Sequence, residues 1–592
     1  MFEVEKDYSR DALFDPMGLR RLRDSYLKDD EASPQDRFAF VAGSFGSNQE
    51  HAQRLYDYAS KHWLSFATPI LAYGKTSKGL PVSCYLVFMP DSAEGLVDTL
   101  SEVNWLSMLG GGVGIGIGIR SEDEKSVGVM PHLKIYEASS LAYRQGKTRR
   151  GSYAAYLDID HPNIVQFIEM RKPTGDQNMR CLEIHHGVNV SDKFMRLIER
   201  CMRDDTVDDT WELRDPGSSV VKDRISAKWL WEQLLEIRMR TGEPFFHFID
   251  TSNRCLPEFQ KEKGLSIKQS NICAEIALAV DEDRTAVCCL SSLNLDYWDQ
   301  WKDDYQFYRD VAEMLDNVLT VFIEKAPKAV HRAVYSASQE RAIGIGALGF
   351  HSLLQSKGIP FESALAVSLN NQIFSRYEKY LDTANRELAL ERGECPDGVG
   401  YGVRFSHMTA LAPNASSSII MGNTSPSIEP NRANAYRQDT LSGSFLNKNK
   451  HLDKIILKES EKHNRSWYDE TWSSIVTHAG SVQHLTWMDD YTKDVFKTAS
   501  ELDQRWIVEL AADRQKFIDQ SQSLNLFFKA ETSIPYLSHV HFMAWKKGLK
   551  SLYYCRSDKI YHGDSMDRKV ERVRLEDQFE KSIEETCIAC EG

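Results

Sequence analysis

The chain has 592 residues, of which 42% are hydrophobic and 27% charged, a composition typical of a globular protein. Its formal net charge of -14 argues against a general affinity for nucleic acid or for an anionic membrane surface. The N-terminus lacks an apolar signal-like segment, and the roughly 18 consecutive apolar residues of a membrane-crossing helix do not occur, so we predict a cytoplasmic protein.

Three regions are predicted along the chain. Residues 1–65 are mostly polar with helical spacing, which predicts a helical layer. Over residues 66–563, short apolar runs bounded by Gly, Pro and Ser alternate with helical patterns, which favours one α/β unit. Residues 564–592 are charged and poor in large apolar side chains, which predicts a flexible tail.

A helix is predicted over residues 91–109, just before the glycine-rich run GGGVGIGIGIR. Asp91 and Glu94 resemble a capping pair at its start, and Gly110 is a natural stop. Its apolar face is expected either to pack in the core or to form a dimer contact. Because the glycines follow a helix, whereas a dinucleotide-binding loop follows a strand, we expect them to allow close backbone approach instead.

The segment KQSNICAEIAL, residues 268–278, places Asn271, Cys273 and Glu275 at every second position. On a strand or an extended loop tip, such side chains point to the same side and converge on one small volume. A buried free cysteine often acts as a small hydrophobic residue, and this structural interpretation stays open. A carboxylate among apolar neighbours needs a partner, a proton or a function, which favours chemistry.

Cys587 and Cys590 form a C-x-x-C motif close to the chain end. A structural zinc ion needs about four protein ligands, and the sequence offers no second C-x-x-C or paired His motif to complete the set. We therefore favour a dithiol that exchanges disulfides from a flexible tail over a zinc site.

Two further motifs have both an ordinary and a functional interpretation. The adjacent Tyr553 and Tyr554 follow a helical stretch, and paired aromatic residues in strands usually just pack. Ser416, Ser417 and Ser418 precede an apolar run, where they form either an ordinary helix cap or a site for a phosphate group.

Taken together and in this order, the motifs resemble the large catalytic subunit of ribonucleotide reductase. SNICAEI is similar to the family's Asn-x-Cys-x-Glu finger loop, and SLYYC to its pair of radical-transfer tyrosines. ATPIL and PVSCYL resemble segments that begin its barrel, AVCCLSSLNL its second redox cysteine and CIACEG its C-terminal tail. The resemblance implies a ten-stranded α/β barrel of two five-stranded halves, with a central cysteine finger loop and an N-terminal helical layer.

The resemblance also implies roles in the radical-based reduction of ribonucleoside diphosphates to 2′-deoxyribonucleoside diphosphates. Cys273 would become a transient thiyl radical that removes the ribose 3′-hydrogen, because the S–H and C–H bonds are comparable in strength. Glu275 would take the 3′-hydroxyl proton, and Asn271 would hold the ribose hydroxyls. Cys84 would protonate the departing 2′-hydroxyl and then form a disulfide with a partner cysteine.

The partner of Cys84 is one of two adjacent cysteines, Cys288 and Cys289. The family pattern is Cys-x-Leu followed by a small residue, which Cys288 alone satisfies. On a strand the two side chains face opposite sides, so one of them can reach Cys84. We expect Cys288 to be that residue.

Substrate-binding residues are carried over from the same resemblance. Thr68, Ser83 and the three serines at 416–418 match positions that bind the substrate's diphosphate and sugar.

Effector-binding residues are carried over in the same way. Asp91 matches a contact to the ribose of an allosteric dNTP or ATP. Arg120 and Arg150 resemble residues of the loops that sense the effector, although the second loop has an extra Lys147 and Arg149.

Partners follow from the same roles. Tyr553 and Tyr554 imply a radical supplied by a separate metal-containing small subunit, so neither a metal nor another cofactor is expected in this chain. The tail implies a thioredoxin- or glutaredoxin-type reductant, and a homodimer is expected.

Two alternative functions fit these residues less well. A cobalamin-dependent reductase would need no tyrosine pair, and a silent nucleotide-binding relative would need no reactive cysteines. Because 65 residues precede SFATPIL, we expect a short form without the N-terminal ATP cone, as in viral members.

Overall fold

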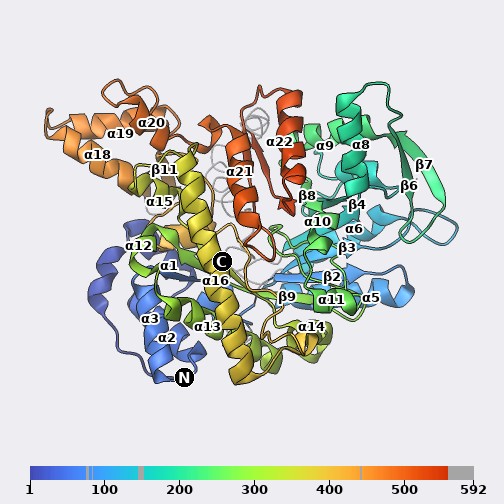
Figure 1. The fold of residues 1–592 in the computed structure, drawn as a ribbon, viewed down its shortest axis with the longest axis horizontal. Helices are drawn as coiled ribbons and strands as arrows, with labels where there is room; N and C mark the ends of the chain where they lie inside the picture. Colours follow the sequence, from blue (N-terminus) through green and yellow to red (C-terminus); the bar gives the residue numbers. More distant parts are fainter. Residues whose placement is uncertain (75–78, 83, 144–151, 441–442, 558–592) are drawn as a thin grey trace.

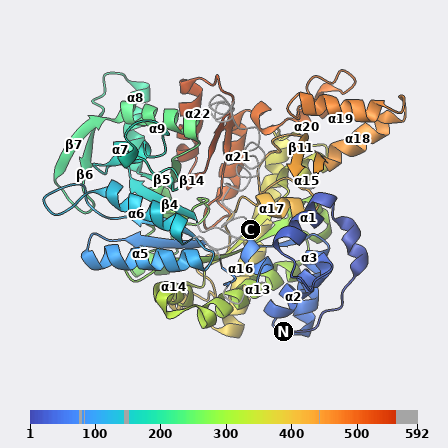
Figure 2. The same ribbon diagram turned by 180° about the vertical axis from the view of Figure 1, so that it is seen from behind.

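The computed structural model describes residues 1–74, 79–82, 84–143, 152–440 and 443–557. Its centre is a curled mixed sheet of nine strands, around which the helices form an outer layer (Figure 1). The N-terminal helices cover one side of this sheet, and the rear view shows them beside α13 (Tyr305–Lys325) and α17 (Ala415–Ile420) (Figure 2).

The N-terminal layer folds as its polar, helix-spaced sequence predicts. Each of its α-helices begins at a side chain that caps free backbone N–H groups, namely Asp15, Ser33 and Asn48. Their apolar faces join the main core. The elements are η1 (Tyr8–Leu13), α1 (Pro16–Ser25), α2 (Pro34–Phe45) and α3 (Gln49–Ser60).

Five neighbouring parallel strands form one half of the barrel in the order β2-β3-β4-β5-β8. The strands are buried along most of their length, as expected where helices cover a parallel sheet. They are β2 (Cys84–Met89), β3 (Gly112–Ile117), β4 (Ser152–Asp158), β5 (His185–Val190) and β8 (Phe245–Phe248). The helices between them are α5 (Ala93–Met108), α6 (Val129–Ala142), α7 (Ile164–Ile168), α8 (Asp192–Arg203) and α9 (Ala227–Thr241), with the hairpin β6 (Thr210–Arg214) and β7 (Val221–Ser226) before α9.

The long strand β9 (Ala286–Asn294) joins this half to the other side of the barrel. It runs antiparallel to β2 and to β1 (Leu64–Phe66), and parallel to β10 (Ile343–Leu348). At the opposite edge, β14 (Ser551–Leu552) pairs antiparallel with β8. The remaining elements around this side are α4 (Thr68–Leu71), α10 (Ile249–Arg254), α11 (Glu258–Glu262), α12 (Trp298–Trp301), α13 (Tyr305–Lys325), α14 (His331–Glu340), α15 (Phe350–Ser356), α16 (Ala364–Arg392), α17 (Ala415–Ile420), α21 (Gln504–Gln515), β13 (Leu526–Phe528), α22 (Ile534–Lys546) and β15 (Cys555–Ser557).

Two extended segments close the gap between β10 and β14. Residues 407–411 bond through their backbone to β10 on one side and to residues 520–523 on the other. Leu524 and Leu526 then bond to Tyr553 and Tyr554, just beyond β14. The barrel expected from the resemblance is therefore present, with short irregular segments in place of regular strands at this position.

The predicted helix before the glycine-rich run is α5, with one local correction. Its cap is Ser92, whose side chain accepts from the Gly95 N–H, so the expected Asp91 capping pair is wrong. The stop is near the expected place, because Gly110 has φ +85° directly after the C-cap.

A separate small core lies at the edge of the molecule. It is built from residues 435–496, including Leu452, Trp472, Ile475 and Phe496. Its helices extend away from the barrel at the upper left of Figure 1. Its elements are β11 (Ala435–Thr440), β12 (Gly443–Lys448), α18 (Lys450–Ser460), α19 (Trp467–Thr477) and α20 (Asp490–Val495).

Candidate active site

The predicted finger loop is a turn rather than a strand. The Ala274 N–H bonds to the Asn271 carbonyl at 3.2 Å, and Ala274 has φ +63°. A left-handed conformation costs an alanine on the order of 1 kcal/mol, so neighbouring contacts must hold it. Asn271, Cys273 and Glu275 are all fully buried inside the barrel.

Hydrogen bonds from facing segments fix this turn. The Tyr156 hydroxyl on β4 donates to the Asn271 carbonyl at 2.6 Å. From the other side of the barrel, the Ser523 hydroxyl lies 2.6 Å from the Cys273 carbonyl and 3.1 Å from Glu275 Oε2. The reactive side chains therefore sit on a loop tied to both halves of the fold.

The glycine-rich run is β3, and its glycines allow the loop to approach. A Cβ on Gly114 would lie 2.1 Å from the Ser270 carbonyl oxygen, and a Cβ on Gly116 would lie 2.3 Å from Gln269 Oε1. Any larger residue at either position would overlap the base of the finger loop. The expectation of close backbone approach is confirmed.

Cys84 and Cys288 lie opposite one another on antiparallel neighbours β2 and β9. Residues paired in this way have Cα atoms about 4.5–5.5 Å apart, within the range that a disulfide needs. The adjacent Cys289 is the register partner of Ile343 on β10. Burial raises the pKa of the Cys288 thiol well above its usual value, which keeps the thiol protonated.

The finger loop also lies beside this cysteine pair. Asn271 Nδ2 is 3.9 Å from Cys84 Sγ. Gln520 accepts from the Ala277 N–H just after the loop, and its Nε2 is 3.5 Å from Cys288 Sγ. Both thiols are therefore within reach of a substrate that contacts Asn271.

The two tyrosines lead from the finger loop toward the surface. The Tyr553 hydroxyl lies 3.6 Å from Cys273 Sγ, and the rings of Tyr553 and Tyr554 have centroids 4.3 Å apart. Tyr553 is fully buried, whereas 7% of Tyr554 is exposed. Cys273, Tyr553 and Tyr554 thus form a continuous row of oxidisable groups.

The predicted phosphate-binding residues that the structure describes lie on two short helices, α4 and α17, beside α1 and its C-cap residue Tyr26. Thr68 begins α4, and its hydroxyl is 3.1 Å from that of Tyr26. Ser416, with Ser417 and Ser418, lies in the first turns of α17. The Arg21 guanidinium donates to Ser416 Oγ at 2.9 Å, which brings a cation to this segment.

Two of the predicted effector residues meet in an ion pair. Asp91 follows β2 and Arg120 follows β3, and their side chains are 2.6 Å apart. Both therefore lie beyond the carboxyl ends of neighbouring parallel strands, where ligands commonly bind. Of the other predicted residues, Ser83, Arg150, Cys587 and Cys590 lie outside the described residues.

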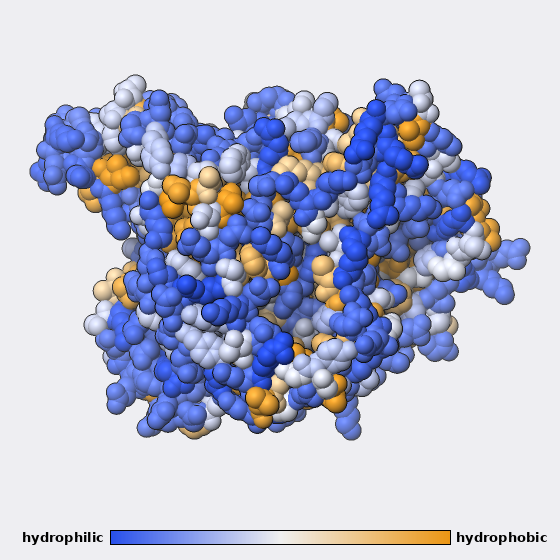
Figure 3. All heavy atoms as spheres, in the orientation of Figure 1, coloured by the Kyte–Doolittle hydropathy of each residue, from blue (hydrophilic) through white to orange (hydrophobic). Residues whose placement is uncertain are grey.

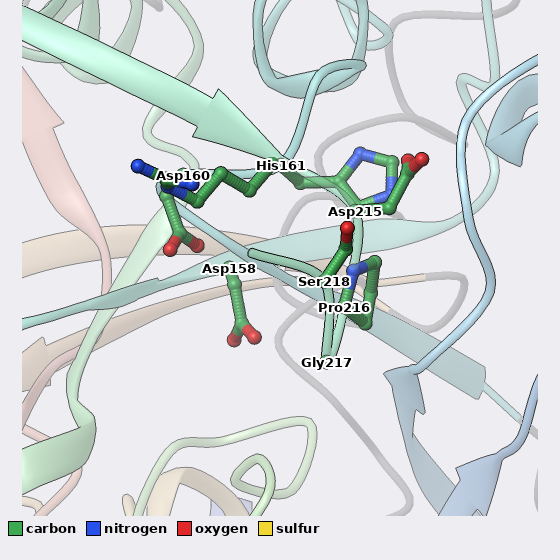
Figure 4. A pocket seen from close by; sticks show the side chains of 8 residues that line it. Asp158, Asp160, His161, Asp215, Pro216, Gly217 and Ser218 are labelled. Atoms are coloured by element: carbon green, nitrogen blue, oxygen red, sulfur yellow. The ribbon is translucent and has the colours of Figure 1, made fainter. Parts of the chain in front are cut away.

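A polar pocket of about 120 Å³ lies near this end of the sheet, away from the cysteine pair. The carboxylates of Asp158, Asp160 and Asp215 and the ring of His161 line it (Figure 4). Both nitrogens of His161 already lie at hydrogen-bond distance from backbone groups, those of Ile119 and Asn163. The His161 ring therefore stabilises the surrounding loops, and the residues that line the pocket include no thiol.

Another cluster has the residue types of a metal site, but its groups already have partners. The ligand atoms of His51, Asp310 and Glu313 lie within 4.8 Å of one another. Asp310 receives two bonds from Arg54, and Glu313 pairs with Arg392. Arginines thus supply the positive charge that a cation would supply. This cluster joins the N-terminal layer to α13.

Several residues of this site were not identified in the sequence. Ser523 and Gln520 contact the finger loop and Cys288 from about 230 to 250 positions away. The polar run QSQSLN after a helix of mixed polar and apolar residues was the available signal, because buried polar residues need partners. Arg21 gave no signal, since an arginine in a polar helix is ordinary.

A closed barrel with a central thiol loop, a facing pair of thiols and a buried pair of tyrosines is the arrangement that the resemblance to the reductase family implies. The family model described as "Ribonucleotide reductase, barrel domain" matches residues 82–398 and 396–555, and "Ribonucleotide reductase, all-alpha domain" matches residues 12–79. The chain belongs to the ribonucleotide reductase large-subunit family, a family of oxidoreductases.

Full-length relatives agree with this assignment. The chain is 51% identical to the "Ribonucleoside-diphosphate reductase large subunit" of Invertebrate iridescent virus 3, covering 99% of both chains. It is 36% identical to the subunit of the same name from Invertebrate iridescent virus 6, over 96% of this chain and 94% of that one. The solved "Actinobacillus ureae class Id ribonucleotide reductase alpha subunit" has a TM-score of 0.80 at 31% identity, covering 93% of this chain and 98% of that one.

Among the residues that the structure describes, no helix has the length and apolar composition needed to cross a bilayer.

Proposed function

We propose that this chain reduces ribonucleoside diphosphates to 2′-deoxyribonucleoside diphosphates for DNA synthesis, with Cys273 as the thiyl radical. The observation that carries the proposal is the position of one thiol, Cys273, on a loop whose Asn271 reaches a facing pair of thiols. On this proposal residues 66–563 hold the chemistry, while residues 1–65 pack against them and residues 564–592 carry electrons.

The proposed reaction balances within these residues. The Cys273 thiyl radical takes the ribose 3′-hydrogen, and Glu275 takes the 3′-hydroxyl proton. The 2′-hydroxyl leaves as water with a proton from Cys84. Cys84 and Cys288 then supply two electrons and become a disulfide while the Cys288 hydrogen goes to C2′. Glu275 returns its proton to the 3′-oxygen, and Cys273 returns its hydrogen to C3′.

Substrate binding follows from the same geometry. Asn271 would hold the ribose hydroxyls, while Thr68, Ser83 and Ser416 with its two neighbours would bind the diphosphate and sugar. Hydroxyls together with backbone N–H groups are common ligands of phosphate oxygens. The Arg21 contact to Ser416 adds positive charge where the phosphates would lie.

The reducing pair is tested by comparing two adjacent cysteines. The parent, Cys288→Ser and Cys289→Ser are reduced and mixed with a radical-supplying subunit and CDP, and dCDP per active site is measured. We expect the parent and Cys289→Ser to form dCDP and Cys288→Ser to form none, since the register pairs Cys288 with Cys84. If Cys288→Ser formed dCDP and Cys289→Ser did not, the proposed pair would be incorrect.

The radical and the electrons for further turnovers come from other proteins on this proposal. A metal-containing small subunit would oxidise Tyr554, and the hole would pass through Tyr553 to Cys273. Cys587 and Cys590 would reduce the internal disulfide and then be reduced by a thioredoxin- or glutaredoxin-type protein. This cycle needs thiols that stay reduced, which favours a cytoplasmic location.

Allosteric control and dimer formation are proposed for neighbouring surfaces. A dNTP or ATP would bind near Asp91, Arg120 and Arg150. Beside this site, α5 and α6 pack together and expose large apolar side chains, among them Trp105 and Ile135. The face of the molecule in Figure 3 is mostly hydrophilic, with small scattered hydrophobic groups. Clustered exposed apolar residues are typical of protein interfaces, so we infer that these helices bind a second copy.

A further inference from the structure

The outer tyrosine of the pair contacts a histidine that no proposed step uses. His185, the first residue of β5, lies with its Nδ1 3.3 Å from the Tyr554 hydroxyl oxygen. The same Nδ1 is 2.6 Å from Glu243 Oε1. One imidazole nitrogen therefore faces both a carboxylate and the phenol through which the radical would enter.

The charge on Glu243 decides which atom carries the hydrogen. Burial opposes ionisation, but Arg171, His185 and His186 together hold the pKa of Glu243 well below its usual value. Glu243 is thus a carboxylate, and it accepts hydrogen bonds. The short contact then requires a hydrogen on His185 Nδ1, and the Tyr554 oxygen is a second acceptor for that hydrogen.

The other charged groups around His185 leave this assignment unchanged. Arg171 and His186 face the second oxygen of Glu243, at 3.5 and 3.0 Å. The Arg556 guanidinium carbon lies 3.9 Å above the centroid of the Tyr554 ring. A cation on the ring face disfavours a positively charged tyrosine radical, so the electron and the proton of Tyr554 must leave together.

We propose that His185, oriented by Glu243, is a positioning residue that donates its Nδ1–H to the Tyr554 oxygen. The Tyr554 hydroxyl hydrogen is then not bound to the imidazole and remains available for transfer. This inference rests on the proposed function and deepens it.

The hydrogens and electrons balance without a proton passing to His185. An oxygen-centred radical on the small subunit takes the Tyr554 hydrogen atom, so the Tyr554 O–H bond breaks and the donor becomes reduced. Tyr553 then gives its hydrogen atom to the Tyr554 oxygen, and Cys273 gives its own to the Tyr553 oxygen. Each step breaks one O–H or S–H bond and forms one O–H bond.

A spectroscopic experiment tests the hydrogen bond itself. The full chain, with 3-aminotyrosine in place of Tyr554 to trap the radical, is mixed with the small subunit in D₂O and studied by deuterium ENDOR. We expect an exchangeable deuteron bonded to the radical oxygen, and its loss in His185→Phe. His186→Gln is the matched control, because His186 contacts Glu243 but not Tyr554, and it should keep the deuteron. A deuteron that persists in His185→Phe would overturn the inference.

The Glu243→Gln variant gives a second test. Without the carboxylate, neutral His185 can present a bare Nδ1 that captures the Tyr554 hydrogen. We expect the kcat for CDP to fall roughly tenfold relative to the parent, the effect of about one hydrogen bond, with KM unchanged. A parent-like kcat in Glu243→Gln would contradict a donor role.

The outcomes separate this inference from the function on which it rests. Tyr554→Phe lacks an O–H bond and should form no dCDP. If that variant were active, the proposed radical route itself would fail. If it were inactive while His185→Phe kept the parent kcat and the ENDOR deuteron, the route would stand and the role of His185 would be refuted.

Discussion

The Cys273 thiol and the Tyr553 hydroxyl meet at 3.6 Å in a volume closed to solvent, since both side chains are fully buried. A hydrogen atom can pass between sulfur and oxygen only at such short range, and a thiyl radical open to water would react with other molecules. The left-handed Ala274 beside Cys273 is held by the Ser551 hydroxyl, which donates to its carbonyl at 2.6 Å. Strain at this turn is thus part of what orients the thiol.

A buried carboxyl outside the site makes the stability of the fold depend on pH. Glu340, at the end of α14, is fully buried, and this burial raises its pKa to about 7 in spite of Arg284 nearby. A carboxyl with a raised folded-state pKa contributes stability that is complete below about pH 4.5 and is lost as the pH rises through 7. The parent should therefore become less stable over this range.

Glu340→Gln tests this dependence. The glutamine cannot ionise, so the unfolding free energy of the variant relative to the parent should rise by on the order of 3 kcal/mol between pH 4.5 and pH 8. Melting temperatures of both proteins at several pH values measure this change. A constant difference at every pH would mean that Glu340 ionises normally in the folded chain.

At the scale of single residues, the sequence predicted which side chains belong to the site wherever a short local pattern was informative. The alternation of Asn271, Cys273 and Glu275 indicated one shared volume, and the family resemblance gave each a proposed role. Contacts such as those of Ser523 and His185 could not be predicted, because their partners lie about 250 and 370 positions away. Only the closed barrel brings these positions together.

At the scale of elements, the finger loop can pack where it does only because the glycines of the neighbouring strand β3 lack side chains. The Gly114→Ala substitution on β3 would place a Cβ 2.1 Å from the Ser270 carbonyl oxygen. Overpacking of this kind typically costs about 1–3 kcal/mol. We expect a lower melting temperature and a loss of turnover by at least tenfold, because the displaced loop moves Cys273 away from Tyr553. Parent-like activity and stability would show that the loop does not rest on β3.

Elements whose apolar residues recur with a clear period could be predicted from the sequence, whereas the closure of the barrel could not. The helix after residue 91 follows from the spacing of its apolar residues, and the close approach at the glycine run follows from the absence of side chains, although no strand was predicted there. Residues 407–411 and 520–526 are too short and too polar to give a strand pattern, yet they complete the ring. For this reason the barrel was implied by resemblance and could not be derived from periodicity.

At the scale of the whole molecule, the exposed apolar side chains of α5 and α6 predict self-association. Trp105 on α5 is 42% exposed. Trp105→Glu places a charge on this surface, so we expect a monomer in light scattering at a dNTP concentration where the parent is a dimer. Val220→Glu is the control, since Val220 is 63% exposed but lies between β6 and β7. Dimers of Trp105→Glu, or monomers of both variants, would contradict the proposed dimer surface.

The most direct measurement concerns the thiol at the centre of the barrel. Cys273→Ser is assayed for dCDP formation with the radical-supplying subunit, and its CDP affinity is measured by calorimetry. A hydroxyl has almost the same shape as a thiol, but its O–H bond is too strong to give a radical under the same driving force. We predict unchanged CDP binding and no dCDP. Measurable dCDP from Cys273→Ser would contradict the assignment of Cys273 as the hydrogen-abstracting group.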